Sequence, residues 1–354
     1  MKVYALPADA FGCGHYRVIW PADVLRSQGF DVTIIPPDGK SGFEVNVQEG
    51  RLVGAKVPED ADVIVMQRPA HPLQPQLIQM MRQNHIAVVV DMDDDMSSIH
   101  PNNIAFNLYR PTSASPMSWR HAAVSCREAT LVTVSTPALR RVYGSHGRCA
   151  VLDNYVPQRC LEYPKPVTGR FGWAGTTASH PNDLQVTGRA IQDLIDAGHP
   201  FQVIGGKSKV QQVAKLRELP SFTGGIGLDR WVATIAENCD VGMVPLAPTA
   251  FNASKSRLKG IEYLAARVPF VYSPREEYRR LHRESGCGLL AETPKQWFAQ
   301  VKRLLDDDAL RQEQVEMGQA RTPFLRFGDR VRIEAFAAPG ESLFGAIDQV
   351  VERA

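Results

Sequence analysis

The sequence lacks the features of a membrane-spanning or exported protein. None of its apolar runs approaches the roughly 20 residues that a helix needs to cross a bilayer. Its first residues alternate like a strand, whereas an export signal carries a charged segment and then an apolar one. Its six cysteines show no C-x-x-C spacing, which favours reduced, structural thiols over a dithiol or zinc site. We therefore expect a cytoplasmic protein without a transmembrane segment.

The sequence also lacks an excess of charge of either sign. Its 40 Lys and Arg residues are balanced by 38 Asp and Glu residues, which gives a formal net charge of +2. Nucleic-acid-binding domains usually carry a bulk basic excess, so composition favours other partners, although a local basic groove stays open. With 354 residues, 44% of them hydrophobic, the chain exceeds what one core usually organises, and we expect two domains.

Short β-rich runs alternate with amphipathic helical stretches, which is typical of parallel sheets covered by helices. A first series predicts strands at 2–6, 31–35, 63–66, 86–90, 131–134 and about 150–152, with helices at 16–28, 74–83 and 119–129. Residues 155–169 contain three prolines and break both periodicities. A second series then predicts strands at 171–174, 201–204, 241–244 and 270–272, with helices at 182–197, 228–238 and 256–266.

These two series predict two domains of the same kind. We expect an amino-terminal Rossmann-like domain over 1–155, a linker over 156–169 and a second Rossmann-like domain over 170–325. The remaining residues, 326–354, return to helical spacing. We expect them to form a helical tail that packs back toward the first domain.

A glycine turn lies between the first predicted strand and the first predicted helix. Glycines at such a turn, here Gly12 and Gly14, let backbone amides approach a phosphate, and the helix dipole favours an anion there. The third glycine of the dinucleotide-binding fingerprint is absent, so a hydride-transfer function loses its main support. A phosphate-binding turn and a purely structural tight turn both stay open.

The most informative segment runs from Asn252 to Val271. Lys255 precedes a predicted helix on which Lys259 and Glu262 are three residues apart, so both side chains project on one face. Cations in this position can neutralise a diphosphate, and one carboxylate can accept both hydroxyls of a ribose. The alternative interpretation is a solvated helix face of mixed charge.

The stretch 254–271 resembles the donor-binding helix and following strand of retaining GT-B glycosyltransferases. Residues 126–156, 171–176 and 239–246 resemble three further segments of that family, in the order that its fold requires. The resemblance implies an α/β protein with the GT-B fold, in which two Rossmann-like domains face each other across a cleft.

The resemblance also implies the activity. A glycosyltransferase of this kind, a hexosyl- or pentosyltransferase, moves a sugar from a nucleotide-diphosphate sugar to an acceptor hydroxyl, with retention of configuration. Its expected donor-binding residues are Gly12, Gly14, Gly175, Thr176, Ser254, Lys255, Lys259 and Glu262. In the family a Glu-x7-Glu pair is common, and Glu262 matches its second member. The first member falls on Ser254, so the contacts made there to the donor sugar do not carry over, and Lys255 or Asn252 are alternatives.

Four carboxylates, at 91, 93, 94 and 95, directly follow a predicted buried strand. They repel each other and need a cation, a basic neighbour, water or raised pKa values. Because basic side chains and helix dipoles usually replace a metal in the GT-B fold, we predict no cofactor and no metal ligand, although a divalent ion stays open. With Lys255 and Lys259, we take Asp93 and His100 as catalytic candidates that contact the sugar; capping and surface roles are the alternatives.

An irregular Pro-, Asn- and Ser-rich loop covers residues 101–118 and follows a strand's carboxyl end. Ligands bind at this edge of open α/β sheets, so we interpret the loop as acceptor-side, with a mobile loop as the alternative. The acceptor-side candidates are Asp91, Phe106, Tyr109 and Trp119. The acceptor itself stays open among a glycan, a protein, a glycolipid and a modified DNA base. A nucleotide-sugar epimerase or hydrolase and a noncatalytic sugar- or nucleotide-binding protein are the alternative functions.

Overall fold

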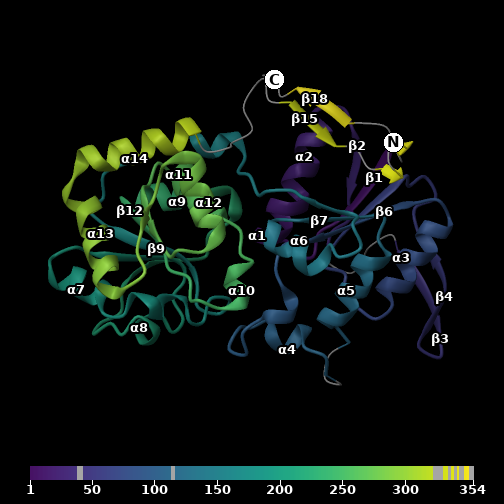
Figure 1. Cartoon of the computed structure of the whole chain (residues 1–354), viewed down its shortest axis with the longest axis horizontal. Helices are drawn as coiled ribbons and strands as arrows, with labels where there is room; N and C mark the ends of the chain where they lie inside the picture. Colours follow the sequence, from purple (N-terminus) through teal and green to yellow (C-terminus); the bar gives the residue numbers. More distant parts are fainter. Residues whose placement is uncertain are drawn as a thin grey trace.

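The computed structural model describes residues 1–37, 43–112 and 116–321, with side chains to residue 319, and the backbone of four short strands between 330 and 350. It contains two six-stranded parallel sheets, in the orders β2-β1-β5-β6-β7-β8 and β11-β10-β9-β12-β13-β14. In Figure 1 the two sheets lie side by side, each covered by its own helices. The predicted fold class, two Rossmann-like α/β units, is confirmed.

The first sheet is built from the amino-terminal half of the chain. Its strands are β1 (Lys2–Leu6), β2 (Asp31–Ile34), β5 (Val63–Gln67), β6 (Ala87–Met92), β7 (Leu131–Val134) and β8 (Cys149–Val151). Its helical elements are α1 (Gly12–Gly14), the π-helical turn η1 (His15–Ile19), α2 (Trp20–Ser27), α3 (Gln74–Gln83), η2 (Met96–Ser98), α4 (Phe106–Tyr109), α5 (Trp119–Glu128) and α6 (Pro137–Tyr143). The central strands are rich in valine because helices bury both faces of the sheet. An exposed hairpin of β3 (Glu44–Gln48) and β4 (Arg51–Lys56) was not predicted.

The second sheet repeats the plan. Its strands are β9 (Phe171–Thr176), β10 (Phe201–Gly206), β11 (Ser221–Thr223), β12 (Val241–Val244), β13 (Phe270–Tyr272) and β14 (Leu289–Leu290). Its helical elements are η3 (Gln158–Leu161), η4 (Asp183–Thr187), α7 (Ala190–Asp196), α8 (Val210–Val213), α9 (Leu228–Asn238), α10 (Ala250–Ala253), α11 (Leu258–Ala265), α12 (Glu276–Ser285), α13 (Pro294–Asp306) and α14 (Asp308–Arg321).

Helix α11 is fixed tightly against this second sheet. The Tyr263 hydroxyl accepts a hydrogen bond from the backbone N–H of Ala174, at 3.0 Å. A Cβ atom on Gly242 would lie 2.6 Å from the Tyr263 ring, so strand β12 needs a glycine where this ring crosses it. The face of α11 that carries Lys259 and Glu262 therefore has a set orientation.

The described parts of the tail are strands. Strand β15 (Arg330–Ile333) pairs antiparallel with β18 (Ile347–Val350), and β16 (Phe336–Ala338) pairs with β17 (Glu341–Ser342). The prediction of a helical tail is wrong for these residues. Arg330-Val331-Arg332-Ile333 alternate polar and apolar residues with the period of a strand, and this signal was missed. The packing of the tail toward the first domain stays a prediction.

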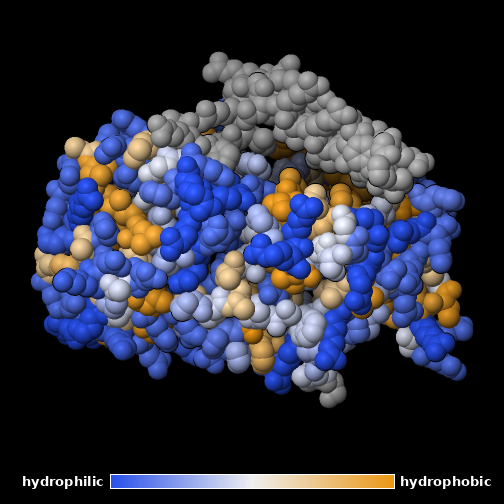
Figure 2. Space-filling model, in the orientation of Figure 1, coloured by the Kyte–Doolittle hydropathy of each residue, from blue (hydrophilic) through white to orange (hydrophobic). Residues whose placement is uncertain are grey.

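The surface offers no extended apolar face in the view of Figure 2, where hydrophilic residues cover most of the molecule and hydrophobic ones form separate groups. In the part of the chain that the structure describes, no helix has the length and apolar character to cross a membrane.

Candidate active site

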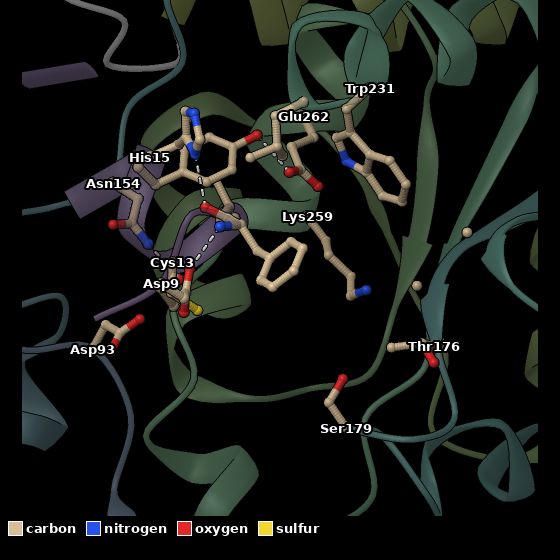
Figure 3. Close-up of a pocket in the computed structure, with 18 of the residues that line it drawn as sticks. Asp9, Cys13, His15, Asp93, Asn154, Thr176, Ser179, Trp231, Lys259 and Glu262 are labelled. Atoms are coloured by element: carbon tan, nitrogen blue, oxygen red, sulfur yellow. Dashed lines mark hydrogen bonds between the residues drawn. The ribbon is translucent and has the colours of Figure 1, made fainter. Parts of the chain in front are cut away.

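A cavity of about 1200 Å³ lies between the two sheets. Its walls come from the loops that follow β1, β6, β9, β10, β11 and β12, and from the start of α11. All of these loops leave the carboxyl ends of parallel strands, which is where open α/β sheets bind ligands. Figure 3 shows Glu262, Lys259 and Trp231 on one side of the cavity and Asp9, Cys13 and Asp93 on the other.

Glu262 on α11 is 6% exposed and faces this cavity. Its Oε1 accepts a hydrogen bond from the hydroxyl of Tyr16, at 2.6 Å, so the two domains meet at this carboxylate. Burial raises the pKa of Glu262, against the hydrogen bond from Tyr16 and the charge of Lys259. The indole of Trp231 also hydrogen-bonds to this carboxylate. Because each carboxylate oxygen can accept more than one hydrogen bond, Glu262 retains capacity to accept from a ligand in the cavity.

Lys259 lies one turn earlier on the same helix and extends into the cavity (Figure 3). Its Nζ donates to the carbonyl of Ala174 at 2.5 Å and lies 5.6 Å from the Trp173 ring centroid. It forms no ion pair with a carboxylate of the described residues. Burial lowers the pKa of Lys259. A Cβ on residue 175 would come within 2.7 Å of Nζ, so Gly175 leaves room for this side chain.

Lys255 precedes the helix and has a partner in the other domain. Its Nζ donates to Asp94 Oδ1 at 2.7 Å. It also lies 4.4 Å from the Phe251 ring centroid. Both Lys255 and Asp94 line the cavity, so this ion pair joins the two domains at the cavity wall.

Basic side chains neutralise carboxylates of the loop after β6, which is one of the four alternatives that the sequence left open. Arg68 binds Asp93 with two nitrogens, one of them at 2.6 Å from Oδ2, and lies 3.6 Å from Asp94. Burial opposes the charge of Asp93, but the Arg68 guanidinium outweighs it and lowers the pKa of Asp93 to about 2. Asp95 caps η2 by accepting from the backbone N–H of Ser97. Within the described ranges, no cluster of His, Cys, Asp or Glu side chains is arranged to hold a metal ion.

Asp91 was predicted on the acceptor side of the cavity, but it lies buried outside the cavity wall. Arg17 donates to both of its carboxylate oxygens, at 2.6 and 3.1 Å, and Thr133 donates to Oδ1 at 2.7 Å. Asp91 is 2% exposed and is not part of the cavity wall. It has no free face for an acceptor and serves instead to anchor the first turn of the amino-terminal helix.

The two glycines of the first turn differ. Gly12 lines the cavity, and a side chain there would meet open space. The Gly14 amide donates to Asp9 Oδ1 at 3.0 Å, and a Cβ at this position would lie 1.8 Å from the Asp9 carbonyl oxygen. Gly14 is thus required for close packing, and its amide is already hydrogen-bonded within the protein. Of the two glycines predicted to contact a phosphate, only Gly12 lines the cavity.

Five other predicted residues lie outside the cavity wall. Ser254 is buried where the two domains meet, and its backbone carbonyl accepts a hydrogen bond from Thr136 Oγ1 at 3.1 Å. His100 contacts Asn182 of the other domain, Nε2 to Nδ2 at 2.9 Å, beside a separate cavity of about 10 Å³. The three aromatic acceptor candidates pack against the amino-terminal core instead of facing the cavity: Phe106, Tyr109 and Trp119. Gly175 and Thr176, by contrast, line it as predicted.

Sequence reasoning did not assign several residues that line the cavity or organise it. Tyr16 contacts Glu262 from the other domain. Arg68, in a left-handed conformation with φ of 50° directly after β5, holds the acidic loop. His180 pairs with Asp183, Nδ1 to Oδ2 at 2.7 Å. Only His180 and Asp183 had a usable signal, because they follow the opening strand of the second domain.

Comparison with solved structures places this fold among the two-domain glycosyltransferases. Sucrose-phosphate synthase from Thermosynechococcus elongatus matches with a TM-score of 0.60 and 13% identity, over 91% of this chain and 94% of that one. An alpha-glucosyltransferase in complex with UDP and DNA containing an HMU base matches with a TM-score of 0.59 and 13% identity, over 90% and 94%. TarM of S. aureus is a looser match, at a TM-score of 0.49 and 13% identity, over 81% of this chain and 62% of that one.

The two sheets, the cavity between them and the two neighbours with TM-scores of 0.60 and 0.59 define the class as a GT-B fold protein. Residues 168–307 match the family described as glycosyl transferases group 1. This match covers most of the second domain and, together with the GT-B fold, identifies the chain as a glycosyltransferase that uses a nucleotide-sugar donor. No curated protein matches the chain in sequence.

Proposed function

We propose that the cavity binds a nucleoside-diphosphate sugar with its ribose on Glu262 and its diphosphate on Lys259 and Lys255. The observation that carries the proposal is the pair on α11: a buried carboxylate and an ammonium without a counter-ion, one turn apart, that face the same cavity. A carboxylate accepts both hydroxyls of a ribose, and an ammonium neutralises phosphate. UDP is the first nucleotide to test, because the alpha-glucosyltransferase of similar fold was solved with UDP.

Transfer proceeds with retention in this proposal. The bond from the sugar's anomeric carbon to the diphosphate oxygen breaks, and the acceptor oxygen forms its bond on the same face. The departing phosphate oxygen takes the acceptor's proton. The cations stabilise the charge that develops on this oxygen. Asp93 is a poor base for the acceptor, because its pKa of about 2 and its two bonds to Arg68 keep it ionised and engaged.

The acceptor enters from the amino-terminal wall of the cavity. Phe11 lies there with 77% of its surface exposed, beside Asp9 and His15. An exposed aromatic ring beside polar groups suits either a sugar or a base as acceptor. A cytoplasmic location fits the six cysteines, which form no disulfide with one another, and the supply of nucleotide sugars.

A thermal-shift series with UDP, GDP, ADP, TDP and their glucose conjugates tests the donor assignment, because a selective ligand raises apparent stability by mass action. We expect one nucleotide to stabilise the protein selectively and Glu262→Ala to abolish most of this shift. The matched control is Glu276→Ala on α12, an exposed glutamate outside the cavity wall, which should retain it. An unchanged shift in Glu262→Ala contradicts the ribose assignment.

The alternative functions separate in a second assay. Incubation with the donor alone tests for an epimerase or hydrolase, either of which converts the donor at full rate without an acceptor. A transferase requires the acceptor for full turnover. A noncatalytic binding protein shows the thermal shift and no conversion with any acceptor.

A further inference from the structure

We propose that His180 is a catalytic residue of the transfer: its imidazole takes up a proton when the donor binds and hydrogen-bonds, through Nε2–H, to the phosphate oxygen that leaves the sugar. Asp183 acts as its positioning residue. The inference rests on the proposed donor site and adds to it a charged group that the pair on α11 does not include.

The geometry fixes one side of the imidazole. His180 follows β9 in a turn closed by a hydrogen bond from its backbone N–H to the Thr176 carbonyl, at 3.1 Å. Its Nδ1 lies 2.7 Å from Asp183 Oδ2. The other oxygen of Asp183 accepts from the Ala247 amide at 2.9 Å and from Asn252 Nδ2 at 2.6 Å. These hydrogen bonds fix Asp183 to the loop after β12. Because its carboxylate can only accept hydrogen bonds, Nδ1 of His180 must carry the hydrogen.

His180 borders both the donor cavity and the small cavity beside Asn182. His180 lines the cavity together with Thr176 and Lys259, and its side chain keeps 14% of its surface exposed. Nε2 makes no hydrogen bond to a described residue. Because Asp183 accepts from Nδ1–H, the neutral ring carries its lone pair on Nε2. The ring can therefore take a proton at Nε2, the nitrogen that Asp183 does not engage.

The surrounding charges set when that proton is taken. Burial lowers the pKa of His180, Lys259 and Lys255 lower it further, and Asp183 acts in the opposite direction. His100 approaches the far side of the same loop through Asn182. In the empty cavity, burial and the neighbouring cations keep His180 neutral at pH 7. A bound diphosphate places negative charge beside Nε2, raises the pKa of the imidazole and favours the imidazolium.

The sign of the pH dependence follows. Since the pKa of His180 is higher in the complex than in the free protein, nucleotide binding is strongest below the pKa of the free protein, weakens as the pH rises between the two pKa values, and levels off above the pKa of the complex. Each binding event withdraws up to one proton from solvent. When the sugar–phosphate bond breaks, the imidazolium donates a hydrogen bond to the oxygen that gains charge, and the proton returns to solvent on product release.

Isothermal titration calorimetry measures this proton directly. The probe is whichever of UDP, GDP, ADP and TDP stabilises the protein most, titrated at pH 7.5 in PIPES, HEPES and Tris. The slope of binding enthalpy against buffer ionisation enthalpy gives the number of protons taken up. We expect a clear uptake, approaching one proton, for the wild type. In His180→Gln we expect uptake near zero and binding weaker by roughly tenfold, the size of one charge-assisted hydrogen bond.

Two further variants separate the inference from a structural role. In Asp183→Asn the amide nitrogen faces Nδ1, so the ring changes tautomer and presents a neutral Nε2–H. This variant should bind the probe with reduced proton uptake, which a merely structural Asp183 would not produce. Glu262→Gln should weaken binding but keep the uptake of the wild type.

The outcomes are distinguishable. A wild-type slope of zero, or an unchanged slope in His180→Gln, overturns the role of His180 and leaves the donor site intact if Glu262→Gln still weakens binding. Unchanged binding in Glu262→Gln, or no binding of any of the four nucleotides, overturns the donor site and this inference with it.

Discussion

Two buried charge systems, one in each domain, differ in how completely the protein satisfies them. Arg17 and Asp91 have side chains that are 2% and 3% exposed, and Leu152, Asn154 and Thr133 complete their hydrogen bonds. On α11, the hydrogen-bond partners of the two charges among the described residues are neutral: a backbone carbonyl for Lys259, and the hydroxyl of Tyr16 and the indole of Trp231 for Glu262. The first system is internal structure. The second leaves two charges without an ion-pair partner at the wall of a cavity, where a ligand can supply the missing partners.

The largest effect is expected from breaking the complete system. Arg17→Met should lower the free energy of unfolding by about 3–5 kcal/mol, because it leaves Asp91 buried without its cation. Urea denaturation followed by circular dichroism measures this change. The double variant Arg17→Met/Asp91→Leu should recover part of the loss, since it removes the uncompensated charge. A double variant as unstable as the single one would show that Asp91 is not what the arginine compensates.

Replacing the cation with methionine on α11 should not destabilise the protein, in contrast to the same replacement at Arg17. Lys259→Met removes an ammonium that has no counter-ion, so the free energy of unfolding of the empty protein should stay constant or rise. Turnover should fall about 100-fold, because the charge on the leaving diphosphate loses a stabilising cation. Denaturation and steady-state kinetics with the donor identified above measure both. Lys302→Met, on the outer face of α13, is the control and should change neither; a strongly destabilised Lys259→Met would contradict the contrast.

Much of the fold could be predicted because its signal is local. The runs around Val88 and Val132 are apolar because both faces of the sheets are covered, and each predicted strand is found within a few residues. The short edge strands β11 and β14 were missed, since two or three residues carry no periodicity. The tail was misassigned because helical spacing was followed where alternation was the better signal.

The site could be predicted only where one element carries it. The spacing of Lys259 and Glu262 predicted that they share a helix face, and the family resemblance assigned that face to the donor cavity, which both residues line. Asp91 and Asp93 are two residues apart in the sequence, yet Arg17 takes one into the core and Arg68 holds the other at the cavity. Those arginines are distant in the sequence, and no spacing rule assigns them. Tyr16 reaches Glu262 across the domain boundary, which a single sequence does not indicate.

A third buried group shows that incomplete pairing alone does not make a ligand site. Glu277 on α12 lies outside the cavity wall, has a side chain that is 5% exposed, and its Oε2 has no hydrogen bond, with Arg280 Nη1 at 3.5 Å. Burial raises the pKa of Glu277 from 4.5 to about 7, against the attraction of Arg280. Arg280 also pairs with Asp153, at the end of the first domain. When ionised, the Glu277 carboxylate therefore lowers the free energy of unfolding, and it does so near the junction of the two domains.

Removing the Glu277 carboxylate should have the smallest effect of the three substitutions, and this effect should depend on pH. Between pH 4.5 and about 7 the folded protein holds a proton on Glu277 that the unfolded chain has released. The contribution of this group to stability therefore falls as pH rises through that window. Glu277→Gln should be nearly neutral at pH 5 and stabilising by about 1–2 kcal/mol at pH 8, as measured by urea denaturation at both pH values. The exposed Glu276→Gln should follow the wild type at both, and a Glu277→Gln variant whose gain is equal at pH 5 and pH 8 would show that packing, not ionisation, sets the cost.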